Sequence, residues 1–146
     1  MLRTAIVGAI AALLLPATLV AATPTPASAG RDFKPWGYTR APDQVLRSGC
    51  HNYRYTYKVD PPGFRWAAEV FLIDPRGVGL ASAAFLKGGD PKQGSETWRI
   101  CRASTKPGRF KMKMKVTYCE ERECRSPTDP RRGYVKPSYF RLTRPG

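Results

Sequence analysis

The residues that could do chemistry in this 146-residue chain are few and unevenly distributed. There is one histidine, His51, against four cysteines and 25 lysines and arginines. A serine or cysteine nucleophile ordinarily needs an imidazole base beside it, and zinc sites need cysteine or histidine ligands at short, regular spacings. His51 directly follows Cys50, and the four cysteines include no Cys-x-x-Cys pair. The sequence therefore predicts no metal site and no cofactor.

A small hydrolase is the enzymatic alternative, and its candidate residues are Glu69 and His51. Glu69 is the one acid in an otherwise apolar segment, 66–73, and carboxylates can hydrolyse glycosides without a histidine. A Glu69 that lies on an outer sheet face, or one that pairs with an arginine, explains the same pattern. His51 is in turn expected to be a partly buried histidine at a sheet edge. We therefore predict a protein without enzymatic activity.

The four cysteines, Cys50, Cys101, Cys119 and Cys124, allow three disulfide pairings. Four residues, 120–123, separate the last two cysteines, a spacing that suits a disulfide across the base of a short loop. That assignment leaves Cys50 to pair with Cys101. Loop entropy alone predicts that the long bridge stabilises the fold by about 4 kcal/mol and the short one by about 2 kcal/mol.

The clearest chemical pattern is an alternation of cations and apolar side chains over residues 109–118. In an extended strand such an alternation places the cations on one face and the apolar side chains on the other. Further arginines follow in the next loops, and a formal net charge of +14 attracts anionic polymers. The same cations would equally serve as a solvated outer face that resists edge pairing. The predicted polyanion-binding residues are Arg109, Lys111, Lys113, Lys115, Arg122, Arg125, Arg131 and Arg132.

The first 29 residues read as an export signal that precedes the fold. A short basic start is followed by an apolar run, and Ala27-Ser28-Ala29 is a signal-peptidase motif. Pro16 and the Thr-Pro-Thr-Pro stretch at 23–26 argue against the alternative, an uncleaved membrane anchor. We expect cleavage after Ala29, a secreted protein without a stable transmembrane anchor, and cysteines that oxidise outside the cytoplasm. The expected organisation is a signal peptide (1–29), an N-terminal arm (30–43) and one domain (44–146).

The elements that must position these residues are strands, because a period of two dominates the chain after the signal. Tyr53, Tyr55 and Tyr57 share one face of a strand and are expected in the core. Turn-forming sequences such as Asp74-Pro75-Arg76-Gly77 separate the strands, and Pro137 interrupts the last one at a sheet edge. The fold class is therefore all-β: a single antiparallel, immunoglobulin-like β-sandwich of six to seven strands with two disulfides.

Several segments resemble small exported proteins of actinobacteria that have an immunoglobulin-like β-sandwich. The resemblance lies in the alanine-rich signal, in Gly49–Tyr57, in Asp74–Gly77 and in Cys101–Phe110, and it covers most of the mature chain. It implies the compartment and the fold. No activity is established for such proteins, so the resemblance implies no site residue.

The partner expected from this pattern is an anionic polymer or surface of the cell envelope, bound by the cationic face. An extracellular protein is the alternative partner, and the Cys119–Cys124 loop would then be the contact, as in an inhibitor or effector. Trp36 and Tyr38, in the arm, are expected either to cover a sheet edge or to contact a ligand. The oligomeric state has no signal in the sequence.

Overall fold

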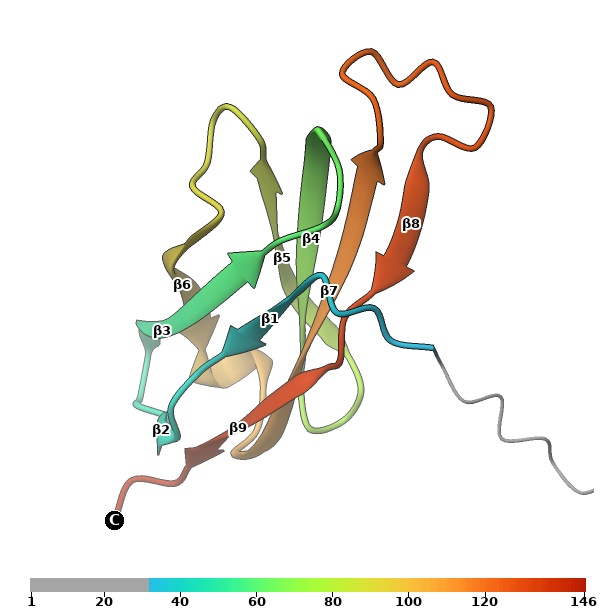
Figure 1. Ribbon diagram of the computed structural model, residues 1–146. Helices are drawn as coiled ribbons and strands as arrows, with labels where there is room; N and C mark the ends of the chain where they lie inside the picture. Colours follow the sequence, from blue (N-terminus) through green and yellow to red (C-terminus); the bar gives the residue numbers. More distant parts are fainter. Residues whose placement is uncertain (1–31) are drawn as a thin grey trace, which may run out of the picture. The chain divides into compact units, whose positions relative to one another are not determined.

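The computed structural model describes residues 32–146, so the predicted signal peptide lies outside the described residues. The described part is all-β, with a single short 3-10 turn at Arg102–Ser104 (Figure 1). Within it no helix is long and apolar enough to cross a membrane. Its strands are β1 (Gly37–Arg40), β2 (Gln44–Val45), β3 (Cys50–Val59), β4 (Arg65–Ile73), β5 (Gly79–Leu86), β6 (Gln93–Cys101), β7 (Gly108–Cys119), β8 (Arg131–Tyr134) and β9 (Ser138–Thr143).

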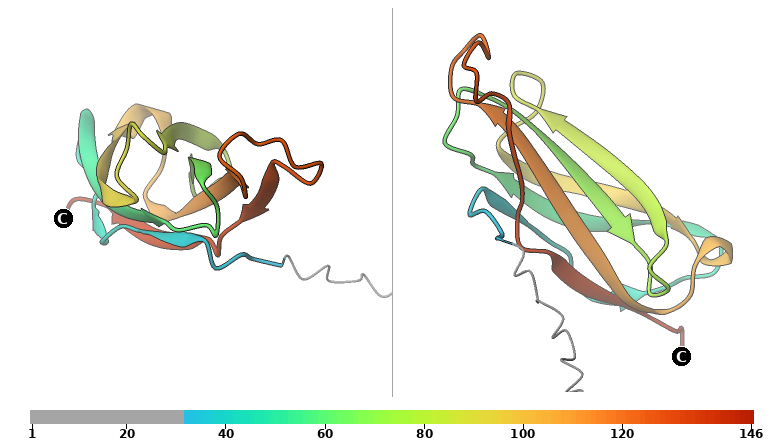
Figure 2. Two further views of the ribbon diagram at one scale, coloured as in Figure 1. Left: turned by 45° about the horizontal axis from the view of Figure 1, so that its top comes forward. Right: turned by 90° about the vertical axis from the view of Figure 1, so that its right-hand side faces the viewer.

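The strands form two sheets, which enclose the core between them. The smaller sheet has the order β1-β3-β6, and the larger has the order β2-β9-β7-β4-β5 and curls strongly (Figure 2). All pairs are antiparallel except β2 with β9, which is parallel. The chain passes between the sheets five times, after β1, β2, β3, β5 and β6. The position of β7 between β4 and β9 places the predicted cationic strand in the middle of the larger sheet.

Nine strands stand where the sequence predicts six to seven, for two reasons. Residues 37–40 of the predicted arm pair with β3 as an edge strand, and β2 is a two-residue pairing with no sequence signal. The last predicted strand is divided into β8 and β9, which pair with the same edge of β7 at different heights. Pro137, between them, cannot donate a backbone hydrogen bond to a neighbouring strand, so the ladder stops there and resumes one residue later.

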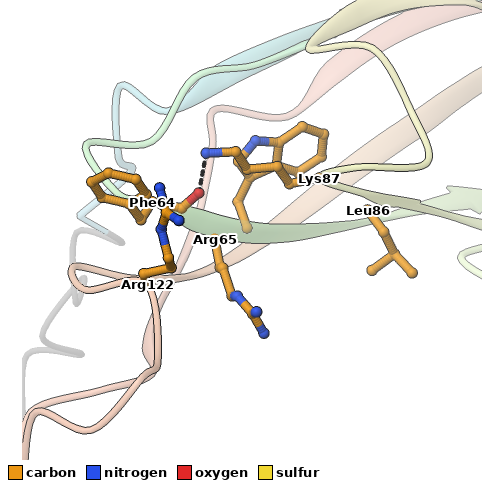
Figure 3. A pocket seen from close by; sticks show the side chains of 6 residues that line it. Phe64, Arg65, Leu86, Lys87 and Arg122 are labelled. Carbon is orange, nitrogen blue, oxygen red and sulfur yellow. Dashed lines mark hydrogen bonds between the residues drawn. The ribbon is translucent and has the colours of Figure 1, made fainter.

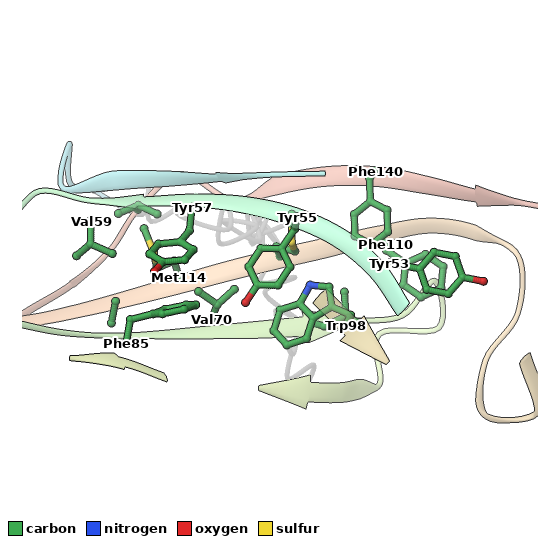
Figure 4. Close-up of a cluster of buried hydrophobic side chains, with 14 of the residues drawn as sticks. Tyr53, Tyr55, Tyr57, Val59, Val70, Phe85, Trp98, Phe110, Met114 and Phe140 are labelled. Atoms are coloured by element: carbon green, nitrogen blue, oxygen red, sulfur yellow. The ribbon is translucent and has the colours of Figure 1, made fainter. Parts of the chain in front are cut away.

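The strand faces predicted from alternation are confirmed in the core. Tyr53, Tyr55 and Tyr57 point inward from β3, and the apolar side chains of β7 are all buried opposite them. The Tyr55 ring stacks on Trp98 (Figure 4), and their ring centroids lie 4.5 Å apart. Burial raises the pKa of the Tyr55 hydroxyl. The apolar side chains that β7 contributes to this core are Phe110, Met112, Met114, Val116 and Tyr118.

Both predicted disulfides are present, Cys50–Cys101 and Cys119–Cys124. Cys50 and Cys101 stand directly opposite each other in the β3–β6 register, and their sulfurs lie on the outer face of the smaller sheet. Both disulfides lie near strand ends and link the edges of the sandwich. Aromatic side chains fill its centre.

A buried carboxylate, Asp74, organises the turn between β4 and β5. The Gly77 amide donates to the Asp74 carbonyl at 2.9 Å, as expected for the predicted type I turn. The Asp74 side chain accepts hydrogen bonds from the Arg76 amide at 2.8 Å, the Val78 amide at 3.0 Å and the Thr105 hydroxyl at 3.1 Å. Because Thr105 lies between β6 and β7, this carboxylate ties together two turns at the same end of the sandwich.

Candidate functional site

The candidate site is the row of cations on the outer face of β7: Arg109, Lys111, Lys113 and Lys115. These side chains alternate with fully buried ones along Gly108–Cys119, so the packing of the core holds all four on the opposite face. Alternate residues of a strand are about 6.5–7 Å apart, and the row is therefore about 20 Å long. We call these four residues the cationic row.

Two exposed tyrosines hold three of the four cations. The Arg109 guanidinium lies 3.9 Å and the Lys111 ammonium 5.9 Å from the centroid of the Tyr139 ring. The Lys113 ammonium lies 5.0 Å from the centroid of the Tyr134 ring. An aromatic face attracts a cation and restrains it without neutralising its charge. The tyrosines therefore fix the row in place and leave its charge available to a ligand.

Lys115, the fourth member of the row, is the only one of these cations with a carboxylate partner in residues 32–146. Its ammonium lies 2.9 Å from a carboxylate oxygen of Glu69, which stands directly opposite it on β4. Glu69 is half-exposed on the outer sheet face. Of the two surroundings expected for Glu69, the outer-face position is confirmed, and its ion-pair partner is a lysine.

The four predicted loop arginines separate into three environments. Arg132 faces Thr117 across β7 and β8, on the same outer face as the cationic row. Arg125 and Arg131 pair with Glu123 and Glu120, each at 2.9 Å. Arg122 lies 5.5 Å from the centroid of the Phe64 ring, at a different pocket. Of these four, Arg132 extends the cationic row, and the local carboxylates offset the charges of Arg125 and Arg131.

A recess of about 500 Å³ opens beside the cationic row, between β8 and the N-terminal segment. Lys113 and Arg132 line it together with two half-exposed rings, Phe33 and Tyr134. Lys34 also lines it, paired there with Asp32. The recess adds aromatic surface to the cationic face, so a ligand that carries both negative charge and flat apolar groups can contact both.

The tyrosines of this site were not identified from the sequence. Tyr134 and Tyr139 are 41% and 45% exposed, and their role depends on which residues they face in β7. Alternation alone places Tyr139 outward, because Phe140 and Leu142 occupy the buried positions of β9. The register against β7, which brings Tyr139 beside Lys111, follows only from the three-dimensional pairing.

His51 and Trp36 of the N-terminal arm both contact neighbouring residues of the fold. The His51 Nε2 atom lies 2.7 Å from the Ser48 carbonyl oxygen, on a partly buried ring, as the sequence predicts. Trp36 packs edge-on against Tyr118 with ring centroids 4.9 Å apart, beside β1. The described residues contain no group of three or more histidine, cysteine or acidic side chains that could hold a metal ion.

No family model, no curated protein and no solved structure matches this chain. The resemblance to exported actinobacterial proteins therefore stays a prediction.

Proposed function

We propose that this protein is a secreted, non-enzymatic binding protein whose cationic row on β7 binds an extended anionic polymer of the cell envelope. The observation that carries this proposal is the arrangement of Arg109, Lys111 and Lys113. Among the described residues these three form no ion pair, and two exposed tyrosine rings hold them in line. A ligand with regularly spaced negative charges can neutralise several of them at once without a change in the fold.

The release of counterions dominates the electrostatic free energy of such binding. Each phosphate or carboxylate contact releases ions condensed on the polymer, so affinity falls steeply as salt rises. A solvated face that serves only solubility would bind no polymer above the level expected from net charge. The order of the cations along one strand is what favours the binding interpretation, since solubility requires no order.

The compartment and the finer architecture belong to the same proposal. The predicted signal peptide and the two disulfides together support export to an oxidising environment. The strand orders β1-β3-β6 and β2-β9-β7-β4-β5, with five passages between the sheets, support an immunoglobulin-like sandwich. In this arrangement the cationic row occupies the outer face of the larger sheet.

A second candidate function is binding of an extracellular protein through the Cys119–Cys124 loop. The disulfide closes this loop over four exposed residues, 120–123, at the end of β7. A loop constrained in this way loses little conformational entropy when it binds. Such an interaction would depend far less on salt than binding by the cationic row.

The proposal is tested by retention of the mature protein on purified cell wall and on immobilised heparin at two salt concentrations. We expect retention at about 50 mM salt and a large loss by about 200 mM on both materials. Retention of one specific protein from culture medium at the higher salt, with no retention on wall or heparin, would favour the second candidate and contradict the first.

A further inference from the structure

A second pocket lies at the end of the larger sheet where β4 begins and β5 ends, separate from the cationic row. Its volume is about 550 Å³, within the range of small-molecule sites. Three segments that are far apart in the sequence form it: the start of β4, the end of β5 and the Cys119–Cys124 loop. Its lining residues are Phe64, Arg65, Trp66, Leu86, Lys87 and Arg122.

The lining of this pocket combines exposed apolar side chains with cations that have no ion-pair partner among residues 32–146. Phe64 and Leu86 are 50% and 56% exposed, although both are large and apolar. Arg65, Lys87 and Arg122 supply three positive charges, and none of them pairs with a carboxylate in the described part of the chain. No acidic residue lines the pocket. The pocket is therefore apolar and cationic at once.

Two of the three positive charges, those of Lys87 and Arg122, are held beside the Phe64 ring. The Lys87 ammonium donates a hydrogen bond to the Phe64 carbonyl oxygen and lies 5.2 Å from the ring centroid. The Arg122 guanidinium lies 5.5 Å from the same centroid. Figure 3 shows both side chains reaching toward Phe64. These contacts fix the positions of the two cations and leave their charge without a counterpart.

We propose that this pocket binds a single amphiphilic anion, a molecule with one phosphate or carboxylate head and an apolar chain or ring. A fully polar anion would leave Phe64 and Leu86 in water, and a neutral apolar ligand would desolvate three cations without compensation. An amphiphilic anion satisfies both halves of the lining. Its apolar part covers the exposed apolar side chains, and its head supplies the negative counter-charge for Arg65, Lys87 and Arg122.

This site is independent of the polymer-binding proposal, because no residue lines the pocket and also belongs to the cationic row. The Cys119–Cys124 disulfide is a second feature of the pocket. Arg122 lies inside the loop that this disulfide closes, so the bridge constrains the backbone that carries one of the three cations. Constraint of the loop lowers the entropic cost of binding a small ligand.

The probe for this proposal is dodecyl phosphate, kept below the concentration at which it forms micelles. Titration calorimetry with the mature protein should show saturable binding of one molecule per chain. Inorganic phosphate, which is the head alone, and dodecyltrimethylammonium, which has the same chain and the opposite charge, should each bind at least about tenfold more weakly. Equal binding of the ammonium compound would overturn the proposal.

Two substitutions test the pocket and a third is their matched control. Phe64→Ser and Arg122→Gln should each weaken dodecyl phosphate binding at least about fivefold, a change of about 1 kcal/mol. Arg125→Gln removes the same charge from a neighbouring exposed arginine that does not line the pocket, and should leave binding unchanged. Circular dichroism would verify that the variants stay folded, as expected for replacements of half-exposed or exposed side chains.

Two further comparisons distinguish this proposal from its competitors. The variant Lys111→Gln/Lys113→Gln/Lys115→Gln should bind dodecyl phosphate as the parent protein does, whatever it does to polymer binding. Binding to phosphatidylglycerol vesicles with no binding to the monomeric amphiphile would contradict the pocket, because it would indicate a membrane-contact surface. Equal losses for Arg122→Gln and Arg125→Gln would also contradict it.

Discussion

Replacement of Asp74 by asparagine removes one negative charge from a buried side chain and leaves its size unchanged. One carboxylate oxygen accepts the amides of Arg76 and Val78, at 2.8 and 3.0 Å, and an asparagine oxygen can keep both bonds. The other oxygen accepts the Arg76 guanidinium at 2.7 Å and the Thr105 hydroxyl at 3.1 Å. An amide nitrogen in that place would face the Arg76 guanidinium, which can only donate, whereas the Thr105 hydroxyl can turn and accept a hydrogen bond from it. The loss of the charge-assisted bond to Arg76 should cost about 1.5–3 kcal/mol.

The effect of this replacement should depend on pH in a defined direction. Burial alone would raise the pKa of Asp74, but the hydrogen bonds from Val78, Arg76 and Thr105 outweigh it and hold that pKa below its ordinary value. A carboxyl whose pKa is lowered by folding stabilises the native state above its unfolded pKa, about 3.9. That stability is lost as the pH falls through the pKa of the folded state. The difference between parent and variant should therefore be full at pH 7 and shrink below about pH 4.

Urea denaturation followed by tryptophan fluorescence measures this difference directly. Unfolding free energies of parent and Asp74→Asn would be compared at about pH 7 and at several values below about pH 4. Asp60→Asn is the control, because Asp60 is an exposed carboxylate whose pKa is lowered by a hydrogen bond from Lys92. It should cost less than about 0.5 kcal/mol. A difference for Asp74→Asn that stays constant from neutral to acid pH would refute the reasoning.

Two further perturbations concern the framework. Replacement of the Cys50–Cys101 pair by serines should lower the unfolding free energy by about 4 kcal/mol, and replacement of the Cys119–Cys124 pair by about 2 kcal/mol, because the first bridge closes the longer loop. Equal losses in denaturation experiments would mean that loop length does not govern the two bridges. Met112→Asp should abolish folding, since it places an unpaired charge at a fully buried position; a cooperative thermal transition near that of the parent would contradict the assigned strand face.

The parts of the fold that were predictable from the sequence are those that depend on local alternation and on chain distance. The buried and exposed faces of β7 follow from a strict period of two, and the disulfide pairing follows from spacing and phase. The division of the last strand into β8 and β9 follows from Pro137 once the position of β7 is known. The two-residue pairing of β2 with β9 has no local signal, because its geometry depends entirely on the neighbouring strands.

The candidate site was predictable only in its charges. The alternation identified the cationic row, but the partners of these cations come from other strands whose register the sequence does not specify. The same limitation applies to Arg125 and Arg131, whose charges are offset by glutamates that the loop conformation brings near them. The pocket around Phe64 was missed because Leu86 and Arg122 approach it from distant parts of the chain.

The central claim concerns the order of the cations in the row, so the decisive variants must differ in position and agree in charge. The row variant is Lys111→Gln/Lys113→Gln/Lys115→Gln. The control variant is Arg54→Gln/Lys58→Gln/Arg99→Gln, which removes three cations from β3 and β6 in the smaller sheet. Both variants lose three positive charges from strand positions that are not fully buried, and both should keep the stability of the parent.

The measurement that tests this claim most directly is the salt dependence of binding to a fluorescein-labelled oligothymidylate, an extended polyanion, by fluorescence anisotropy. Single-stranded polyanions give a slope of about 0.7 in log affinity against log salt for each contact. The row variant should bind more weakly than the parent and flatten the slope by about 1.4, because it removes two cations without an ion pair in residues 32–146, Lys111 and Lys113, together with the Glu69-paired Lys115. The control variant should keep the parent's slope. If both variants lose affinity and slope equally, net charge explains the binding and the cationic row is not a site.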